Sequence, residues 1–168
     1  MELLEVYNNE GNPTGRVVQR GDKSAVFSEN EHIAVGVIFI ENSKGEFLIQ
    51  KTSKEKEGKF SSTGGHITKG ETPLTSIVRE VKEELGIDIN KEDVVELGYL
   101  LYDRPIRFMF YIKQDIDLDK IVLQQEEVEY VEYMTVEQIK SLIKEGLTYT
   151  SHAKMFEKVL EYKQKKNI

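Results

Sequence analysis

Three glutamates in the middle of the chain, Glu80, Glu83 and Glu84, have the spacing of neighbours on one face of an α-helix. Carboxylates this close repel each other, so the cluster indicates that a cation lies among them. Carboxylate oxygens suit Mg²⁺, with Mn²⁺ as a substitute, and a bound diphosphate would complete an octahedral shell. The spacing therefore favours a metal site that activates water and neutralises a phosphoryl group. A solvated helix face is the competing interpretation.

An arginine directly precedes this cluster. Arg79 is one residue from Glu80 and four residues from Glu83. A guanidinium at that position is within reach of a bidentate hydrogen-bonded pair with a carboxylate. Glu71, in the preceding loop, is the other expected partner. We therefore expect Arg79 to orient acidic side chains of the site.

The helix that must position these side chains has clear start and stop signals. Thr72 suits the N-cap, Pro73 suits the first helical position and Gly86 suits the position just past the end. Apolar residues recur at helical spacing along a stripe displaced from the acidic face: Leu74, Ile77, Val78, Val81 and Leu85. We expect this stripe to pack on a β-sheet.

The segment from Gly65 to Ile87 resembles the Nudix box, Gly-x5-Glu-x7-Arg-Glu-U-x-Glu-Glu-x-Gly-U, in which U is a bulky aliphatic residue. Every fixed position is filled, by Gly65, Glu71, Arg79, Glu80, Val81, Glu83, Glu84, Gly86 and Ile87. The resemblance implies an α/β protein with the Nudix fold, in which a mixed β-sheet is sandwiched between helices. It also implies an enzyme, a Mg²⁺-dependent hydrolase of a diphosphate bond in a nucleoside diphosphate derivative or a related small molecule.

The same resemblance implies roles for individual residues. Glu80, Glu83, Glu84 and the carbonyl of Gly65 are the expected metal ligands. Glu83 and Glu84 are also catalytic candidates, together with Arg79, which is expected to pair with Glu71 and hold the helix in place. The number of metal ions and the identity of the general base stay open.

A further glutamate from a loop outside the box serves many Nudix hydrolases as ligand or general base. Glu126 and Glu127 are the candidates in this chain. Glu127 is preferred because it directly precedes the apolar Val128. The alternative is that both glutamates belong to an exposed acidic loop. A general base must reach the attacking water, which depends on the folded geometry.

A narrower resemblance links residues 6–16, 31–34 and 64–66 to the branch that contains isopentenyl-diphosphate isomerase. The isomerases carry a catalytic cysteine where this chain has Gly64, and their box is degenerate whereas this one is intact. Both departures count against isomerase chemistry. Isomerase-like activity and a non-catalytic nucleotide-binding Nudix domain are kept as the alternatives to the hydrolase. His32 and His66 match metal-binding histidines of the isomerases, and we leave both outside the expected ligand set.

Patterns around the box predict a β-rich arrangement. An N-terminal hairpin is expected over residues 3–7 and 16–19, on either side of a turn-forming segment. Further strands are expected over residues 32–40, 46–51, 94–102, 106–113 and 129–134, and helices over 135–145 and 151–165. Thr135 and Gln138 have the spacing of a capping box. The lysine-rich segment 51–59 is predicted to be a solvated loop.

Composition limits the remaining possibilities. The length of 168 residues suits one domain, residues 1–168, and 39% hydrophobic with 32% charged residues is typical of globular proteins. A net charge of −7 disfavours nucleic-acid binding. The chain has no cysteine, which excludes disulfides and suits the cytoplasm, and no segment approaches the roughly 20 apolar residues of a membrane span.

The expected partner is a small-molecule diphosphate. A homodimer is compatible with the family, and the identity of the substrate stays open.

Overall fold

A computed structural model describes residues 2–168 of the chain. Its strands are β1 (Leu3–Tyr7), β2 (Pro13–Gln19), β3 (His32–Glu41), β4 (Phe47–Thr52), β5 (Phe60–Ser61), β6 (Thr63–His66), β7 (Val95–Leu100), β8 (Ile106–Lys113) and β9 (Val128–Met134). Its helices are α1 (Pro73–Leu85), α2 (Val136–Lys144) and α3 (Thr150–Lys166), with 3-10 turns at η1 (Lys54–Lys56), η2 (Lys91–Asp93) and η3 (Leu118–Lys120).

The strand β3 lies at the centre of the sheet, as its long apolar run predicts. It pairs in parallel with β8 from Ala34 to Glu41 and antiparallel with β6 on its other edge. β4 joins β3 only at Glu41 and Phe47, beside their shared turn, so β6 and β4 share that edge. β7 extends the sheet beyond β8, and β9 and β5 pair with β4. The sheet is therefore mixed, as expected.

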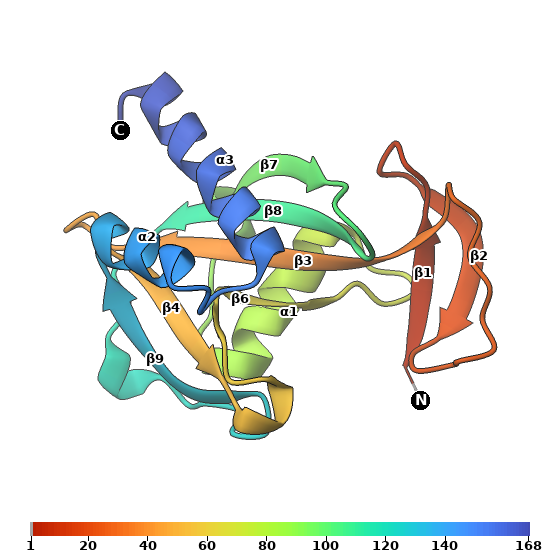
Figure 1. The fold of residues 1–168 in the computed structure, drawn as a ribbon, viewed down its shortest axis with the longest axis horizontal. Helices are drawn as coiled ribbons and strands as arrows, with labels where there is room; N and C mark the ends of the chain where they lie inside the picture. The colour runs from red at the N-terminus through yellow and green to blue at the C-terminus, as the bar shows by residue number, and fades with distance from the viewer. Residues whose placement is uncertain (1) are drawn as a thin grey trace.

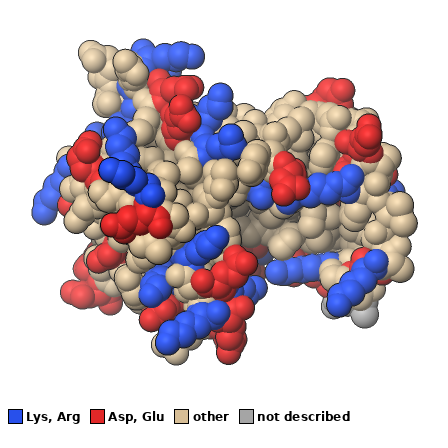
Figure 2. All heavy atoms as spheres, viewed as in Figure 1, with Lys and Arg blue, Asp and Glu red and all other residues tan. Residues whose placement is uncertain are grey.

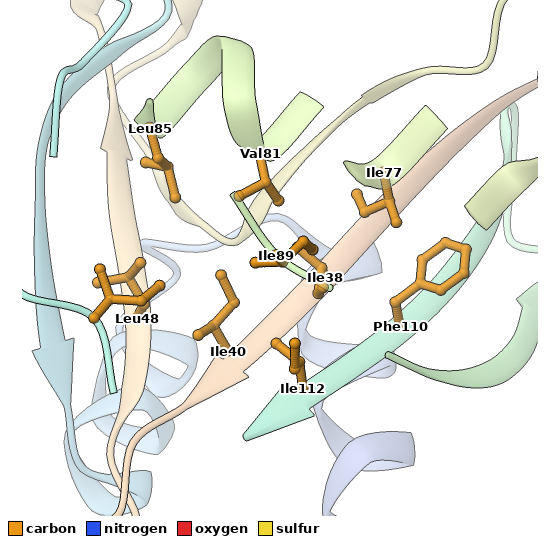
Figure 3. Close-up of a cluster of buried hydrophobic side chains, with 10 residues drawn as sticks. Ile38, Ile40, Leu48, Ile77, Val81, Leu85, Ile89, Phe110 and Ile112 are labelled. Carbon is orange, nitrogen blue, oxygen red and sulfur yellow. The ribbon is translucent and has the colours of Figure 1, made fainter. Parts of the chain in front are cut away.

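The helix α1 covers one face of this sheet. Three residues of its predicted apolar stripe, Ile77, Val81 and Leu85, are buried and project toward side chains of β3, β4 and β8 (Figure 3), and Leu74 and Val78 are partly buried against the same core. Thr72 caps the helix by accepting a hydrogen bond from the backbone N–H of Thr75. The apolar stripe fixes the rotation of the helix, and the acidic face consequently points away from this core.

The helices α2 and α3 lie on the opposite face of the sheet (Figure 1). Phe156 and Val159 of α3 and Ile139 of α2 are buried against Phe39 of β3 and Phe47 of β4. The Thr135 capping box of α2 is present as predicted. Helices therefore sandwich the sheet, which confirms the predicted fold class.

The N-terminal hairpin of β1 and β2 stands beside the main body (Figure 1). β1 also pairs with the start of β3, at Val6 with Ile33. The backbone N–H of Lys69 donates to the carbonyl of Leu3, which ties β1 to the loop between β6 and α1. The hairpin is confirmed, although β2 begins at Pro13, three residues earlier than predicted. This attachment brings the hairpin next to the start of the Nudix box.

Two strands depart from the prediction. β5 and β6 form from a segment that contains Gly64 and Gly65, and glycines disfavour a strand prediction. A Cβ atom on Gly64 would lie 2.2 Å from the carbonyl oxygen of Gly36, so glycine is required for β6 to approach β3 this closely. No helix within residues 2–168 is long and apolar enough to cross a membrane.

Candidate active site

The acidic face of α1 borders a cavity of about 400 Å³ between the helix, β6 and the N-terminal hairpin. Gly65, Arg79, Glu80, Glu83, Glu84 and Glu127 line it, together with Glu2, Arg20, Gly64, His66, Thr68 and Gln124. The structure thus brings together all the predicted site residues except Glu126. Five of the lining side chains are glutamates and only two are arginines, so the cavity is strongly acidic.

Arg79 is the hub of a hydrogen-bonded network. Its Nε and Nη2 atoms donate to the two carboxylate oxygens of Glu71, at 2.7 and 2.9 Å. Nη1 donates to Glu80 at 2.9 Å and to Glu83 at 3.0 Å, and Nη2 also donates to the carbonyl of His66. The guanidinium thereby ties the loop that carries Glu71 to the helix α1, as the resemblance implied.

Glu71 anchors the loop before α1. Burial raises the pKa of this carboxyl, but hydrogen bonds from Arg79 and Thr68 outweigh burial and bring its pKa down to about 2. The Thr68 hydroxyl donates at 2.6 Å and the Thr68 backbone N–H at 3.0 Å. Glu71 is therefore ionised at neutral pH and serves to position Arg79.

Glu80 lies directly against the backbone of the box loop. A Cβ atom on Gly65 would fall 2.2 Å from the carboxyl carbon of Glu80, so only glycine admits this carboxylate. Burial raises the pKa of Glu80 to about 7, although Arg79 opposes the shift. A carboxyl group next to a main-chain segment in a desolvated pocket has the position expected of a metal ligand.

Glu84 is the most deeply buried acid of the cluster, with 6% of its surface exposed. Among residues 2–168, its carboxylate accepts a hydrogen bond only from the backbone N–H of Gly64, at 3.2 Å. Burial, followed by repulsion from Glu80, raises the pKa of Glu84 to about 8. A cation in the cavity would favour the ionised form of this carboxyl and offset its desolvation.

The glutamates share the cavity without forming a ready set of metal ligands. Arg79 binds Glu80 and Glu83, whereas Glu84 turns toward Gly64. In the described part of the chain, no three His, Asp or Glu side chains are grouped closely enough to hold a metal ion. The glutamates nevertheless fit Mg²⁺ or Mn²⁺, because they offer carboxylate oxygens in an acidic cavity. Arg79 binds one carboxylate oxygen of Glu80 and one of Glu83, so the second oxygen of each would serve as a metal ligand.

The two loop glutamates have different surroundings. Glu127 lines the cavity, and its carboxylate pairs with Lys56 of η1 at 3.1 Å. Glu126 is exposed and contributes only its backbone carbonyl, which accepts a hydrogen bond from Ser53. The lysine-rich loop therefore borders the site through Lys56. The geometry supports Glu127 over Glu126 as the additional acid.

The two histidines that match metal-binding residues of the isomerases differ in their position relative to the cavity. His32 is buried at the start of β3, where its Nε2 lies 2.6 Å from the Asn9 side chain, and it does not line the acidic cavity. His66 lines the cavity at the end of β6, and burial lowers its pKa. The structural role expected for a lone buried histidine fits His32.

Sequence patterns missed several residues of the site. Arg20 and Glu2 reach the cavity from the N-terminal hairpin and form an ion pair at 3.4 Å. Gln124 reaches it from the loop before β9. These residues lie outside the box in sequence, so no local spacing relates them to it. A contact across the hairpin interface is visible only in the folded chain.

The fold and site are those of a hydrolase built around a Nudix box, and the family model of the NUDIX domain matches residues 30–159. The chain therefore belongs to the Nudix hydrolase family. Members of this family act on nucleoside diphosphate derivatives and generally depend on a divalent metal.

Relatives of known sequence or structure agree with this membership. An uncharacterized Nudix hydrolase of Listeria monocytogenes is 33% identical over 150 residues, which span 87% of each chain. An isopentenyl-diphosphate Delta-isomerase of Corynebacterium diphtheriae is 31% identical over 113 residues, 64% of this chain and 58% of its own. The crystal structure of DR0079 from Deinococcus radiodurans has a TM-score of 0.72 at 21% identity, and the match covers 88% of this chain and 91% of that chain. This last likeness shows the shared fold.

Proposed function

We propose that this Nudix hydrolase uses Mg²⁺, or Mn²⁺ in its place, to cleave a diphosphate bond in a nucleoside diphosphate derivative or a related small molecule. One observation carries the proposal: Glu80 and Glu84 bring two carboxyls that are largely shielded from solvent into the same acidic cavity. Such a pair is unfavourable in its ionised form unless a cation joins it. The cation would then attract the substrate diphosphate, which the carboxylates alone would repel.

The glutamates of α1 would hold the metal, with Glu84, Glu80 and Glu83 as side-chain ligands and Gly65 as a carbonyl ligand. The bound metal supplies a water of lowered pKa and neutralises charge on the phosphoryl group. Arg79 keeps the carboxylates oriented through its bonds to Glu80 and Glu83.

Glu127 is proposed as the general base. Its carboxylate lines the same cavity as the α1 glutamates and pairs with Lys56 at 3.1 Å. In that position it accepts the proton of the attacking water while Lys56 stabilises the carboxylate. Glu126 points out of the cavity and serves as the natural comparison.

The structure argues against isomerase chemistry at this site. A catalytic cysteine in place of Gly64 would set its Cβ 2.2 Å from the carbonyl oxygen of Gly36, and the backbone of β6 would have to move. Gly64 has no side chain with which to move a proton. Incubation with isopentenyl diphosphate should accordingly yield no dimethylallyl diphosphate.

The experiment that tests the proposal is a substrate screen with the purified full-length chain. The panel holds nucleoside diphosphate sugars, dinucleoside polyphosphates, nucleoside triphosphates and non-nucleotide diphosphates, each with Mg²⁺, with Mn²⁺ and with EDTA. We expect release of phosphorylated products from at least one class with metal and none with EDTA. Hydrolysis of no member of the panel, or equal hydrolysis with EDTA, would contradict the proposal.

A further inference from the structure

A second cavity of about 400 Å³ opens beside the acidic one. The two cavities share Gly64, Gly65, His66, Glu84 and Glu127 in their walls, so they adjoin each other. The second cavity extends over β3, β4 and β8 to the start of α3. A diphosphate held at the α1 glutamates would direct one of its two attached groups into this space.

The half-buried guanidinium of Arg107, on β8, lines this second cavity. Its Nη1 atom donates to the carbonyls of Tyr102 and Pro105, which fixes the side chain. Within residues 2–168, its Nε and Nη2 atoms have no hydrogen-bond acceptor, and no carboxylate lies within 4.0 Å of the guanidinium. Burial lowers the pKa of Arg107, although Asp103 opposes that shift. The free Nε and Nη2 edge is the fork with which arginine binds carboxylates and phosphates.

A buried amide lines the same cavity. Gln50 of β4 is 5% exposed, and its Oε1 accepts a hydrogen bond from the Thr63 hydroxyl at 2.9 Å. The amide nitrogen of Gln50 has no acceptor in the described part of the chain. This nitrogen is a second donor whose partner must come from a ligand or from water.

The other charges of the second cavity are already balanced. Lys56 pairs with Glu127, and Glu84 belongs to the proposed metal site. Arg107 is thus the one cation in this wall, among residues 2–168, that lacks a carboxylate partner. A fixed, desolvated cation with a free fork selects for an anion.

We propose that the second cavity is a specificity subsite for an additional anionic group, a phosphate or a carboxylate, carried by the moiety attached to the diphosphate. The Arg107 fork and the Gln50 amide bind that group. The inference rests on the proposed function for the orientation of the substrate. It narrows the substrate class to diphosphate compounds that carry a further negative charge beyond the scissile bond.

The test compares probes that differ by one anionic group. ADP-ribose and ADP-ribose 2′-phosphate differ by a phosphate, and UDP-glucose and UDP-glucuronate differ by a carboxylate. Dissociation constants are measured by calorimetry in the Glu84→Gln background, with Mg²⁺ and again with EDTA. Because binding is measured in a variant whose turnover should be strongly reduced, the result is independent of whether the wild-type chain hydrolyses any substrate.

We expect the more anionic member of at least one pair to bind on the order of tenfold more tightly, the size expected for a charge-assisted fork. A preference in the first pair alone assigns the subsite to phosphate, and a preference in the second pair alone assigns it to carboxylate. Equal affinities within both pairs, or no binding of any probe, would overturn the proposal.

Matched variants test the residues. Arg107→Gln should reduce the preference to near unity, and Arg107→Lys, which keeps the charge and loses the fork, should leave an intermediate preference. Gln50→Glu keeps the acceptor for Thr63 and should also abolish the preference by repelling the anion. Arg104→Gln is the control, since Arg104 donates to the Ser28 carbonyl outside the cavity and should keep the full preference. A preference that survives in both Arg107→Gln and Gln50→Glu, or that is lost in Arg104→Gln, would contradict the assignment.

Discussion

The guanidinium of Arg79 contacts three glutamates and a main-chain carbonyl at once. Two of those glutamates, Glu80 and Glu83, are proposed metal ligands, so Arg79 competes with the metal for their oxygens. Glu71 holds the guanidinium through both of its carboxylate oxygens, which limits how far Arg79 can move with Glu80 and Glu83. The arginine therefore keeps the carboxylates oriented and leaves Glu84 as the acid that it does not neutralise.

Glu84→Gln tests the metal site at the residue scale. Glutamine keeps the size of the side chain and removes a buried carboxyl with a pKa of about 8, so the variant should fold normally. We expect turnover to fall by roughly 10²- to 10⁴-fold, because a metal ligand and its charge are lost. Glu83→Gln should lower turnover in the same direction.

The melting temperature provides the second readout for Glu84→Gln. Added Mg²⁺ or Mn²⁺ should raise the melting temperature of the wild type by mass action, and the variant should respond less. A wild type that is indifferent to metal, or a variant as active as its parent, would leave the glutamates as a solvated helix face.

Glu127→Gln tests the proposed base, with Glu126→Gln as its matched control on the adjacent residue. Loss of a general base should lower turnover by roughly 10²-fold or more with little change in folding. Glu126→Gln should stay near the wild-type rate, because its side chain lies outside the cavity. If both single variants and the double variant keep wild-type turnover, the base must lie within the box.

The strand β6 is the element on which the site depends most. It pairs with β3 from Val35 to Ile38 and carries Gly64 and Gly65 into the walls of both cavities. Charged side chains of both signs are interspersed on the face of the molecule drawn in Figure 2. The excess of acid in the cavity comes from Glu80, Glu83 and Glu84 of α1 together with Glu2 and Glu127.

Gly64→Ala tests the close approach of β6 and β3. The added Cβ would lie 2.2 Å from the carbonyl oxygen of Gly36, and both atoms belong to paired backbones that cannot move independently. We expect a loss of about 2 kcal/mol or more in the free energy of unfolding. Gly36→Ala is the control, since its Cβ would meet only side-chain atoms, at 3.4 Å and beyond. Urea denaturation of the two variants should show the larger loss for Gly64→Ala, and equal losses would contradict this account.

At the scale of the whole molecule, His152 couples α3 to the sheet and makes stability depend on pH. The ring is fully buried, its Nε2 lies 2.9 Å from the Ser62 hydroxyl, and burial lowers its pKa to about 4. The unfolded chain, with an ordinary histidine pKa near 6.5, therefore binds more protons than the folded chain between about pH 4 and pH 6.5. Stability from this group is present above pH 6.5 and is lost as the pH falls toward 4.

His152→Gln should remove that pH dependence while keeping a hydrogen-bond partner for Ser62. Between pH 7 and pH 5 we expect the wild type to lose roughly 1–2 kcal/mol more of its free energy of unfolding than the variant loses. The difference between the two proteins isolates His152, since Glu71, Glu80 and Glu84 titrate in both. Parallel pH profiles would show that the ring is not buried in its neutral form.

Much of the fold could be predicted from local patterns in the sequence. The spacing of apolar residues and the Thr72 and Gly86 caps fixed α1 to within a residue, and β8 was predicted at its observed bounds. These signals are local, because capping and periodicity depend on neighbours within one or two turns. β5 and β6 were not predicted. They form by pairing with other strands, and the glycines of β6 disfavour a strand prediction.

For the site, the sequence by itself determined the family and the face of α1 that carries the acids, because the box is contiguous and helical geometry converts its spacing into direction. Only the tertiary structure placed Glu127 in the cavity and Glu126 outside it. The fold alone, likewise, placed Arg20 in the cavity that α1 borders and left the Arg107 fork without a partner among residues 2–168. Burial, pKa shifts and charge pairing depend on residues far apart in the chain, and no local pattern in the sequence records those distances.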